Sequence, residues 1–207
     1  MKVGEFKVVD DYFPKWLIHN VSNYIAMIPV RWDNSPYRDT FNKCRFMGNM
    51  LMEKDEWQLK DVPNSWFLQY LIESIKLDIC KEYNITNTLR CLHNGQFPME
   101  IMNAVNHTDA DNDKYLSVIY MGHGASGDTV LCDNDGNDVE RVSFKEGRMV
   151  IFNSHQLHRG EAPTEGYRCT WGLVFPLFDP TFTGESINSL LTLRPWYLHP
   201  YLNYFVL

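Results

Sequence analysis

The chain has 207 residues, of which 44% are hydrophobic and 14% aromatic, and this composition is that of a globular protein with a sizeable core. Its formal net charge of -7 argues against a broad nucleic-acid-binding surface, and no apolar run reaches the roughly 18 residues that a membrane span needs. The five cysteines are odd in number and include no CxxC pair, and charges occupy the N-terminus where a signal peptide would be apolar. We therefore expect a cytoplasmic, reducing location with no membrane or nucleic-acid partner.

The first half of the chain predicts one short strand and two helices. Residues 6–13 ("FKVVDDYF") have the composition of a strand, and a helix is expected around residues 14–28. The strongest helical stretch is residues 63–84, where apolar residues recur at near-helical spacing. Asn64 or Ser65 can cap its N-terminus.

The second half is rich in short runs of Val, Ile, Tyr, Phe and Thr that Gly and Asn/Asp turns separate. Such a pattern predicts a mainly β fold with a closed or double-sheet architecture and the N-terminal helices packed outside. We expect a single domain over residues 1–207. Its expected parts are an N-terminal strand with support helices (1–88), a β core with the functional site (89–178) and an aromatic extension (179–207) that packs across the barrel or an oligomer interface.

The acidic loop "NHTDADND" places His107 and Asp109 two positions apart. Such a pair is more often a solvated turn than a metal site, so the interpretation depends on a third ligand. The segment "FNSHQLHRGEAP" supplies two candidates, His155 and His158. Two imidazoles and one carboxylate on one face of a metal leave other positions open, which suits Fe(II) in oxygen chemistry, whereas a structural zinc site is closed.

Arg168 follows His158 by ten positions, on the predicted strand "YRCTWGLVF". Alternation along a strand places Arg168 and Thr170 on the same face, and an arginine that faces inward needs an anionic partner. The planar guanidinium matches a carboxylate, such as the distal carboxylate of 2-oxoglutarate, whose 2-oxo acid end can chelate iron. A surface salt bridge is the ordinary alternative for a single arginine.

Residues 106–176 resemble the Fe(II)/2-oxoglutarate-dependent dioxygenase family, especially its prolyl-4-hydroxylase-like branch. The resemblance covers about 70 residues and runs in chain order through "HTD", "LSVIYMG", "SGDTVLCDNDG", "FKEGRMVIFNS" and "LHRGEAPTEGYRCTWGLVF". It implies a double-stranded β-helix, also called a jelly roll, with a cupin-like core and flanking helices. This fold agrees with the strand-rich second half.

The resemblance implies that His107, Asp109 and His158 bind Fe(II). His158 is preferred to His155 as the third ligand because "HRG" and the ten-residue step to Arg168 match the family. His155 is then expected to lie in a loop or behind the ligands.

The resemblance also implies how 2-oxoglutarate is bound as a co-substrate with O2. Arg168 would bind its distal carboxylate, with Tyr120 and Thr170 supplying hydroxyl groups beside it. The implied reaction is hydroxylation of an unactivated carbon in a prolyl, other amino-acid or peptide substrate, with release of succinate and CO2. Asp109 favours hydroxylation, because related halogenases lack this carboxylate.

Two other functions remain open. A cupin-like metalloprotein with a different cofactor would leave Arg168 unexplained, and a non-catalytic relative of the barrel would be expected to have lost a ligand. Four polar residues on the strand before the "HTD" motif could line the substrate pocket, although ordinary strand and turn roles are favoured: Arg90, His93, Asn94 and Gln96.

Two further motifs are rejected. "GHGASG" spells a dinucleotide fingerprint but precedes a predicted strand where that fingerprint needs a helix. "DNDGND" fails as a calcium loop because Leu131 and Val142 would occupy ligand positions, so a hairpin turn is expected there.

Overall fold

The structure is a computed structural model, and it describes residues 1–27, 46–60, 65–85, 87–98 and 105–178. The helices are α1 (Lys15–Met27) and α3 (Ser65–Glu82). The strands are β1 (Phe6–Val9), β2 (Phe46–Glu53), β3 (Glu56–Trp57), β4 (Arg90–Gln96), β5 (Tyr115–His123), β6 (Thr129–Cys132), β7 (Asp138–Val142), β8 (Met149–Asn153), β9 (His158–Gly160) and β10 (Arg168–Pro176). Residue 64 and the aromatic extension, residues 179–207, lie outside the described residues.

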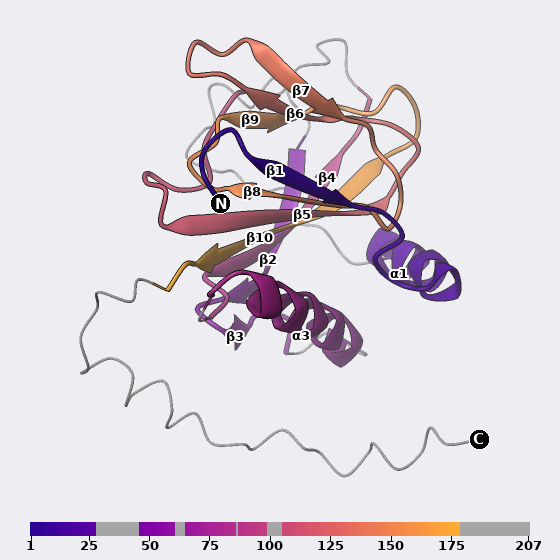
Figure 1. The fold of residues 1–207 in the computed structure, drawn as a ribbon. Coiled ribbons are helices and arrows are strands. Elements are labelled where there is room, and N and C mark those ends of the chain that lie inside the picture. Colours follow the sequence, from indigo (N-terminus) through magenta and orange to yellow (C-terminus); the bar gives the residue numbers. More distant parts are fainter. Residues whose placement is uncertain (28–45, 61–64, 86, 99–104, 179–207) are drawn as a thin grey trace.

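Two antiparallel sheets lie face to face (Figure 1). The larger sheet has seven strands in the order β1-β8-β5-β10-β4-β2-β3, and the smaller has three in the order β7-β6-β9. Both helices lie on the side of the large sheet that faces away from the small sheet (Figure 1). The expectation of a mainly β, jelly-roll architecture with the helices outside is confirmed.

The N-terminal half adds strands as well as helices to this architecture. β1 pairs with β8 at one edge of the large sheet, and β2 pairs with β4 and β3 at the other edge. The predicted strand of residues 6–13 is thus shorter than expected, and the segment 46–57 pairs as strands that the sequence did not indicate. Among the described residues, neither helix has the length and apolar composition needed to cross a membrane.

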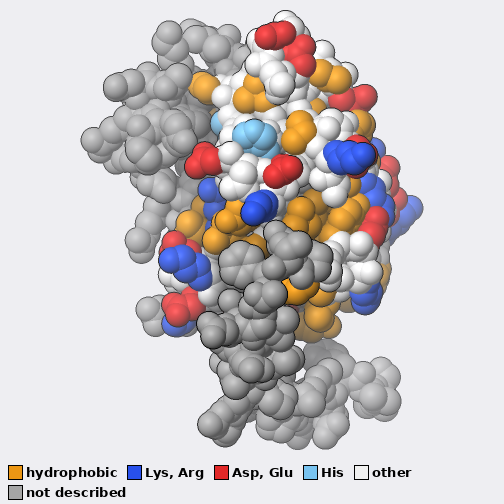
Figure 2. All heavy atoms as spheres, turned by 60° about the vertical axis from the view of Figure 1, so that its left-hand side comes forward, with side chains coloured by type: hydrophobic (Ala, Val, Ile, Leu, Met, Phe, Trp, Pro, Cys, Tyr) orange, Lys and Arg blue, Asp and Glu red, His pale blue; other side chains and the backbone are white. Residues whose placement is uncertain are grey.

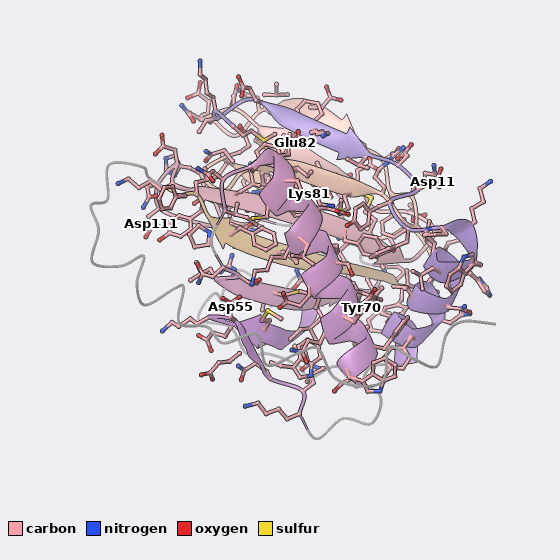
Figure 3. The ribbon with its side chains drawn as sticks, turned by 60° about the horizontal axis from the view of Figure 1, so that its bottom comes forward. Asp11, Asp55, Tyr70, Lys81, Glu82 and Asp111 are labelled. Carbon is pink, nitrogen blue, oxygen red and sulfur yellow. The ribbon has the colours of Figure 1, made fainter. Side chains whose placement is uncertain are left out.

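Helix α3 packs one apolar face against the large sheet and runs across it, with Tyr70 and Lys81 in different turns (Figure 3). Its buried side chains recur at helical spacing: Ser65, Leu68, Leu71, Ile72, Ile75 and Ile79. The apolar side chains of this set share a core cluster with sheet residues that include Tyr120, Trp171 and Phe175. The Ser65 hydroxyl donates to the Leu59 carbonyl at 2.7 Å and accepts from the Trp57 indole at 3.1 Å, so it joins the helix start to β3.

A second cluster fills the space between the sheets and contains Met121, Leu131, Val142, Val150 and Phe152. The two faces of the large sheet therefore have different partners, because successive side chains of a strand point to opposite sides. One face meets the helices, and we call the other, which meets the small sheet, the inner face.

The register of β10 shows which residues share the inner face. Thr170 pairs with Asn94 of β4 and Met121 of β5, and Val174 pairs with Arg90 and Ser117. Between these rows Gly172 pairs with Leu92 and Ile119. Directly paired residues project to the same side of a sheet, so these three rows line the inner face.

The structure agrees with both rejected motifs. The segment after "GHGASG" enters the strand β6, so no helix begins there to bind a phosphate. The residues after β6 form a turn in which the Asp133 side chain accepts from the Asn137 amide at 2.8 Å. This turn joins β6 to β7, as the hairpin interpretation requires.

The packing of α3 generates a test of the core. Replacement of the fully buried Ile75 by alanine removes side-chain contacts between helix and sheet, and we expect it to lower the free energy of unfolding by about 2–5 kcal/mol. Leu77 of the same helix is 64% exposed, so Leu77→Ala is expected to change it by no more than about 0.5 kcal/mol. Urea unfolding followed by circular dichroism measures both values. Equal losses in the two variants would contradict this packing.

Candidate functional site

A backbone contact brings together two histidines that are far apart in the sequence. The amide of His107 donates to the carbonyl of His158, and the amide of His158 donates to the carbonyl of His107, both at 2.9 Å. His158 begins β9, which pairs with β6 in the small sheet. Residues paired in this way project their side chains to the same side, and the two imidazole centroids lie 4.4 Å apart.

Asp109 completes the cluster from the loop after His107. Its carboxylate Oδ2 lies 3.6 Å from Nε2 of His158. One ligand-type atom from each of the three residues lies within 4.8 Å of the others. His158 is buried, Asp109 is half-buried and His107 is exposed, so the cluster reaches the surface on one side. Figure 2 shows a face of the molecule where histidine, acidic and basic side chains lie close together.

The hydrogen bonds of the imidazoles suit metal binding. Nδ1 of His107 lies 3.0 Å from the carbonyl oxygen of Val105, and Nδ1 of His158 lies 2.9 Å from that of Gln156. A carbonyl only accepts, so Nδ1 carries the proton in each ring and Nε2 of the neutral imidazole keeps its lone pair. Such second contacts are typical of metal-ligating histidines. The residues present therefore fit a divalent metal.

The charge states of His158 and Asp109 also suit metal binding. Burial lowers the pKa of His158 to about 4, so this imidazole is neutral at neutral pH and can act as a ligand. Burial alone would raise the pKa of Asp109, but the positive charge of Arg90 and the hydrogen bond from Ser117 act in the opposite direction and lower it. The carboxylate therefore stays ionised beside two lone-pair donors. A bound cation would balance these groups.

Two residues that the sequence analysis did not assign to the site hold the Asp109 carboxylate. Arg90 of β4 donates through Nη2 to Oδ1 at 2.5 Å, and the Ser117 hydroxyl of β5 donates to Oδ2 at 2.7 Å. Ser117 also lies 2.8 Å from the Ser154 hydroxyl. Arg90 was named as a possible pocket residue without this contact. The only sequence signal for Ser117 was a hydroxyl residue within an otherwise apolar strand.

Arg168 is buried at the first position of β10, on the inner face. Its Nη1 donates to the Gln96 side-chain oxygen at 2.6 Å and its Nη2 to the Thr129 hydroxyl at 3.3 Å. Its Nε is buried without a hydrogen-bond partner, and no carboxylate pairs with it among the described residues. Burial lowers the pKa of Arg168 to about 10, which still leaves the guanidinium charged at neutral pH. An anionic ligand would supply the missing partner.

Two glycines give this guanidinium its space. A Cβ at Gly127 would lie 2.6 Å from Cδ of Arg168, and a Cβ at Gly160 would lie 3.0 Å from its Nη1. Gly127 also has a positive φ of 99°. The glycines of the "GHGASG" and "HRG" segments thus allow backbone to pass close to Arg168.

The two expected hydroxyl residues lie on opposite faces of the sheet. Thr170 is buried and shares the inner face with Arg168. Tyr120 pairs with Trp171 and packs against it at 5.3 Å between ring centroids, and against Phe13 at 5.6 Å, within the helix-side core. The expectation that its hydroxyl faces 2-oxoglutarate does not fit this placement. That hydroxyl is buried without a hydrogen-bond partner in the described part of the chain.

The remaining candidates also separate by face and position. Gln96 contacts Arg168, whereas His93 is buried on the helix side, where Nε2 lies 3.4 Å from the Cys169 sulfur. Asn94 lies on the inner face, and its side-chain oxygen is buried without a partner. His155 is exposed in the turn after β8, with Nδ1 at 3.2 Å from the Ala110 carbonyl, outside the three-residue cluster.

The cluster predicts which histidines are needed for metal binding. We expect His107→Ala and His158→Ala to abolish detectable Fe(II) binding, because each removes one of three ligand atoms. His155→Ala is the matched control and is expected to retain the metal. Anaerobic equilibrium dialysis with Fe(II) measures all three. Loss of iron in His155→Ala together with retention in His158→Ala would reverse the assignment.

Comparison with known proteins supports the fold. No protein-family model and no curated protein sequence matches the chain. Solved structures do match. An oxidoreductase of the 2OG-Fe(II) oxygenase family from Burkholderia pseudomallei aligns with a TM-score of 0.63 and 14% identity, over 83% of this chain and 85% of that one.

Two other structures carry ligands of interest. A prolyl hydroxylase from Trichoplax adhaerens, in complex with a peptide fragment of the hypoxia inducible factor oxygen degradation domain, aligns with a TM-score of 0.58 and 14% identity over 83% of each chain. HygX from Streptomyces hygroscopicus, with nickel and 2-oxoglutarate bound, aligns with a TM-score of 0.55 and 11% identity, over 87% of this chain and 84% of that one. This chain therefore has the jelly-roll fold of the 2-oxoglutarate/Fe(II) oxygenases, which prolyl hydroxylases share.

Proposed function

We propose that the protein is an Fe(II)- and 2-oxoglutarate-dependent dioxygenase that hydroxylates an unactivated carbon of a prolyl, other amino-acid or peptide substrate. The observation that carries this proposal is the pairing of two features in one inner space. One is a cluster of two histidines and an aspartate whose ligand-type atoms lie within 4.8 Å of one another. The other is a buried arginine without a carboxylate partner in the described part of the chain.

His107, Asp109 and His158 would hold the iron. Bound Fe(II) with 2-oxoglutarate and O2 supplies the power to oxidise an unactivated C–H bond, with release of succinate and CO2. The protein keeps the ligand atoms in place through the backbone pairing of the histidines and through the contacts of Asp109. A set of only three protein ligands leaves positions for co-substrate and O2.

Arg168 would bind the distal carboxylate of 2-oxoglutarate. Gln96 and Thr129 hold two of its nitrogens, so the guanidinium is oriented before any ligand arrives. Thr170, the next inward residue of β10, would add a hydroxyl donor. Tyr120 is left out of this proposed site because its ring packs on the helix side of the sheet.

The rows of the inner face suit a short dicarboxylate. The row that contains Arg168 lies at one end of the inner face. The row that contains Val174 and Ser117 lies at the other end, where the Ser117 hydroxyl donates to Asp109. Gly172 stands between them without a side chain, and it is half-buried although its neighbours on β10 are buried. A ligand that joins a metal to Arg168 would cross this row.

The substrate class rests on two supports. The sequence resembles the prolyl-4-hydroxylase-like branch, and a structural neighbour binds a peptide. As a metal ligand, Asp109 would favour hydroxylation over halogenation, as the family resemblance implies. A cupin-like metalloprotein with another cofactor is the alternative that the experiment must separate.

An anaerobic titration tests the metal and the co-substrate together. We expect Fe(II) and 2-oxoglutarate to give the weak visible charge-transfer band of a 2-oxo acid chelate in the wild-type protein, and Asp109→Ala to lose it. Protein that binds iron without this band would favour the cupin-like alternative. With the band in hand, release of succinate in the presence of candidate prolyl peptides identifies the substrate.

Arg168 generates a quantitative prediction. Removal of a charged hydrogen-bonding partner costs about 1.5–3 kcal/mol, so we expect Arg168→Ala to raise the 2-oxoglutarate concentration at half-saturation by about 10- to 100-fold. Fe(II) affinity should stay unchanged. Arg148→Ala is the matched control, since it removes an arginine that pairs with Asp10 away from the site. An unchanged requirement in Arg168→Ala would remove this residue from the co-substrate site.

A substitution at Tyr120 tests whether its hydroxyl lies on the helix side of the sheet, away from the co-substrate. Its buried hydroxyl has no partner, and such a group costs about 1–3 kcal/mol, so we expect Tyr120→Phe to leave the fold equally or more stable. The half-saturating 2-oxoglutarate concentration should not change. Thermal unfolding and the same titration measure both. A raised requirement would mean that the hydroxyl reaches the co-substrate, as the sequence resemblance implied.

A further inference from the structure

Arg90 contacts the candidate metal ligand Asp109 in two places. Its Nη2 donates to the side-chain Oδ1 at 2.5 Å and to the main-chain oxygen of the same residue at 3.3 Å. Its side chain is 31% exposed and that of Asp109 is 15% exposed, so the pair is partly shielded from water. The strand β4 thus holds both the backbone and the carboxylate of Asp109.

The two carboxylate oxygens of Asp109 have different neighbours. Oδ1 meets Arg90, whereas Oδ2 accepts from Ser117 and lies 3.6 Å from Nε2 of His158. The amide of Asp109 also donates to the Ser154 carbonyl at 2.9 Å. The carboxylate is therefore held in one orientation, with Oδ2 toward the imidazoles and Oδ1 turned to the guanidinium.

We propose that Arg90 is a positioning residue that restricts Asp109 to binding the metal through one oxygen. This inference rests on the proposed function. A carboxylate can bind a cation through one or both oxygens, and a second oxygen would occupy a position that the co-substrate or O2 needs. By holding Oδ1, Arg90 keeps that position open.

An ordinary surface ion pair would not account for these contacts. Such pairs are solvated and contribute little, whereas Arg90 also bonds the backbone oxygen of the loop that carries the ligand. The Nε of Arg90 is buried without a hydrogen-bond partner in the described part of the chain, although its Nη2 donates to Asp109. The guanidinium thus keeps its contact with Asp109 while one of its own N–H groups stays unpaired. Arg90 therefore acts through Asp109 and not as a ligand itself.

Co(II) is a suitable probe, because it binds the same kinds of ligand as Fe(II) and its visible absorption depends on coordination geometry. We expect Arg90→Met to change the visible spectrum of bound Co(II), because Oδ1 of Asp109 is then free to bind as a second ligand atom. The Co(II) affinity should be equal or higher, because a neighbouring positive charge is lost. Arg90→Lys, which keeps a charged donor, should restore most of the wild-type spectrum. Arg148→Met is the matched control and should match the wild type in both.

The outcomes separate this inference from the proposed function. If wild-type protein binds no Co(II) and no Fe(II), the proposed function fails and this inference fails with it. If wild-type protein binds Co(II) and Arg90→Met binds it with an unchanged spectrum, Arg90 has no positioning role and the proposed function stands. Near-UV circular dichroism first checks that Arg90→Met is folded. If it is not, Arg90→Gln replaces it, with the same expected direction of change.

Discussion

The candidate site depends on the reciprocal backbone hydrogen bonds between His107 and His158. These bonds join the loop before β5 to the small sheet. Two candidate metal-binding histidines from distant parts of the sequence are therefore paired directly opposite each other. Side-chain contacts alone would leave each histidine on a separate mobile segment, whereas a paired backbone sets the separation of the rings. The position of Asp109 follows, because it lies two residues beyond His107 and its amide bonds to Ser154.

Charge is the second constraint, because ions are costly to bury unless they are paired. At one end of the inner face the ionised Asp109 lies beside Arg90 and Ser117 and close to the imidazoles of His107 and His158. At the other end Arg168 has neutral partners in Gln96 and Thr129. The protein thus leaves negative charge and lone pairs where a cation fits, and positive charge where an anion fits. This complementary arrangement of charge is the physical basis of the proposal that a metal and a dicarboxylate bind here.

Much of this site follows from local sequence, and some of it does not. Motif spacing together with the family resemblance selected His107, Asp109, His158 and Arg168, and alternation along the predicted strand placed Thr170 beside Arg168. The face of Tyr120 was not accessible in this way, since it depends on the pairing of β5 with β10.

Pairing between strands also explains why the roles of Arg90 and Ser117 were missed. Both reach Asp109 because they sit opposite Val174 on either side of β10, and no local pattern indicates that register. The strands β2 and β3 were missed for a related reason, since their pairing to β4 is a long-range contact. Long-range register is therefore what the structure adds to the sequence here.

The same register explains why one row of the inner face stays partly exposed in the middle of a packed sheet. On the helix side, β10 presents Trp171, Leu173 and Phe175, all buried in the main core. On the inner face, Gly172 has no side chain, and its row partners Leu92 and Ile119 are only half-buried. The helix-side residues of β10 are thus packed in the core, whereas Gly172 on its inner face is partly exposed. Because the helix-side core holds β10 in place, Arg168 can keep its position on the inner face while the row of Leu92, Gly172 and Ile119 stays partly exposed.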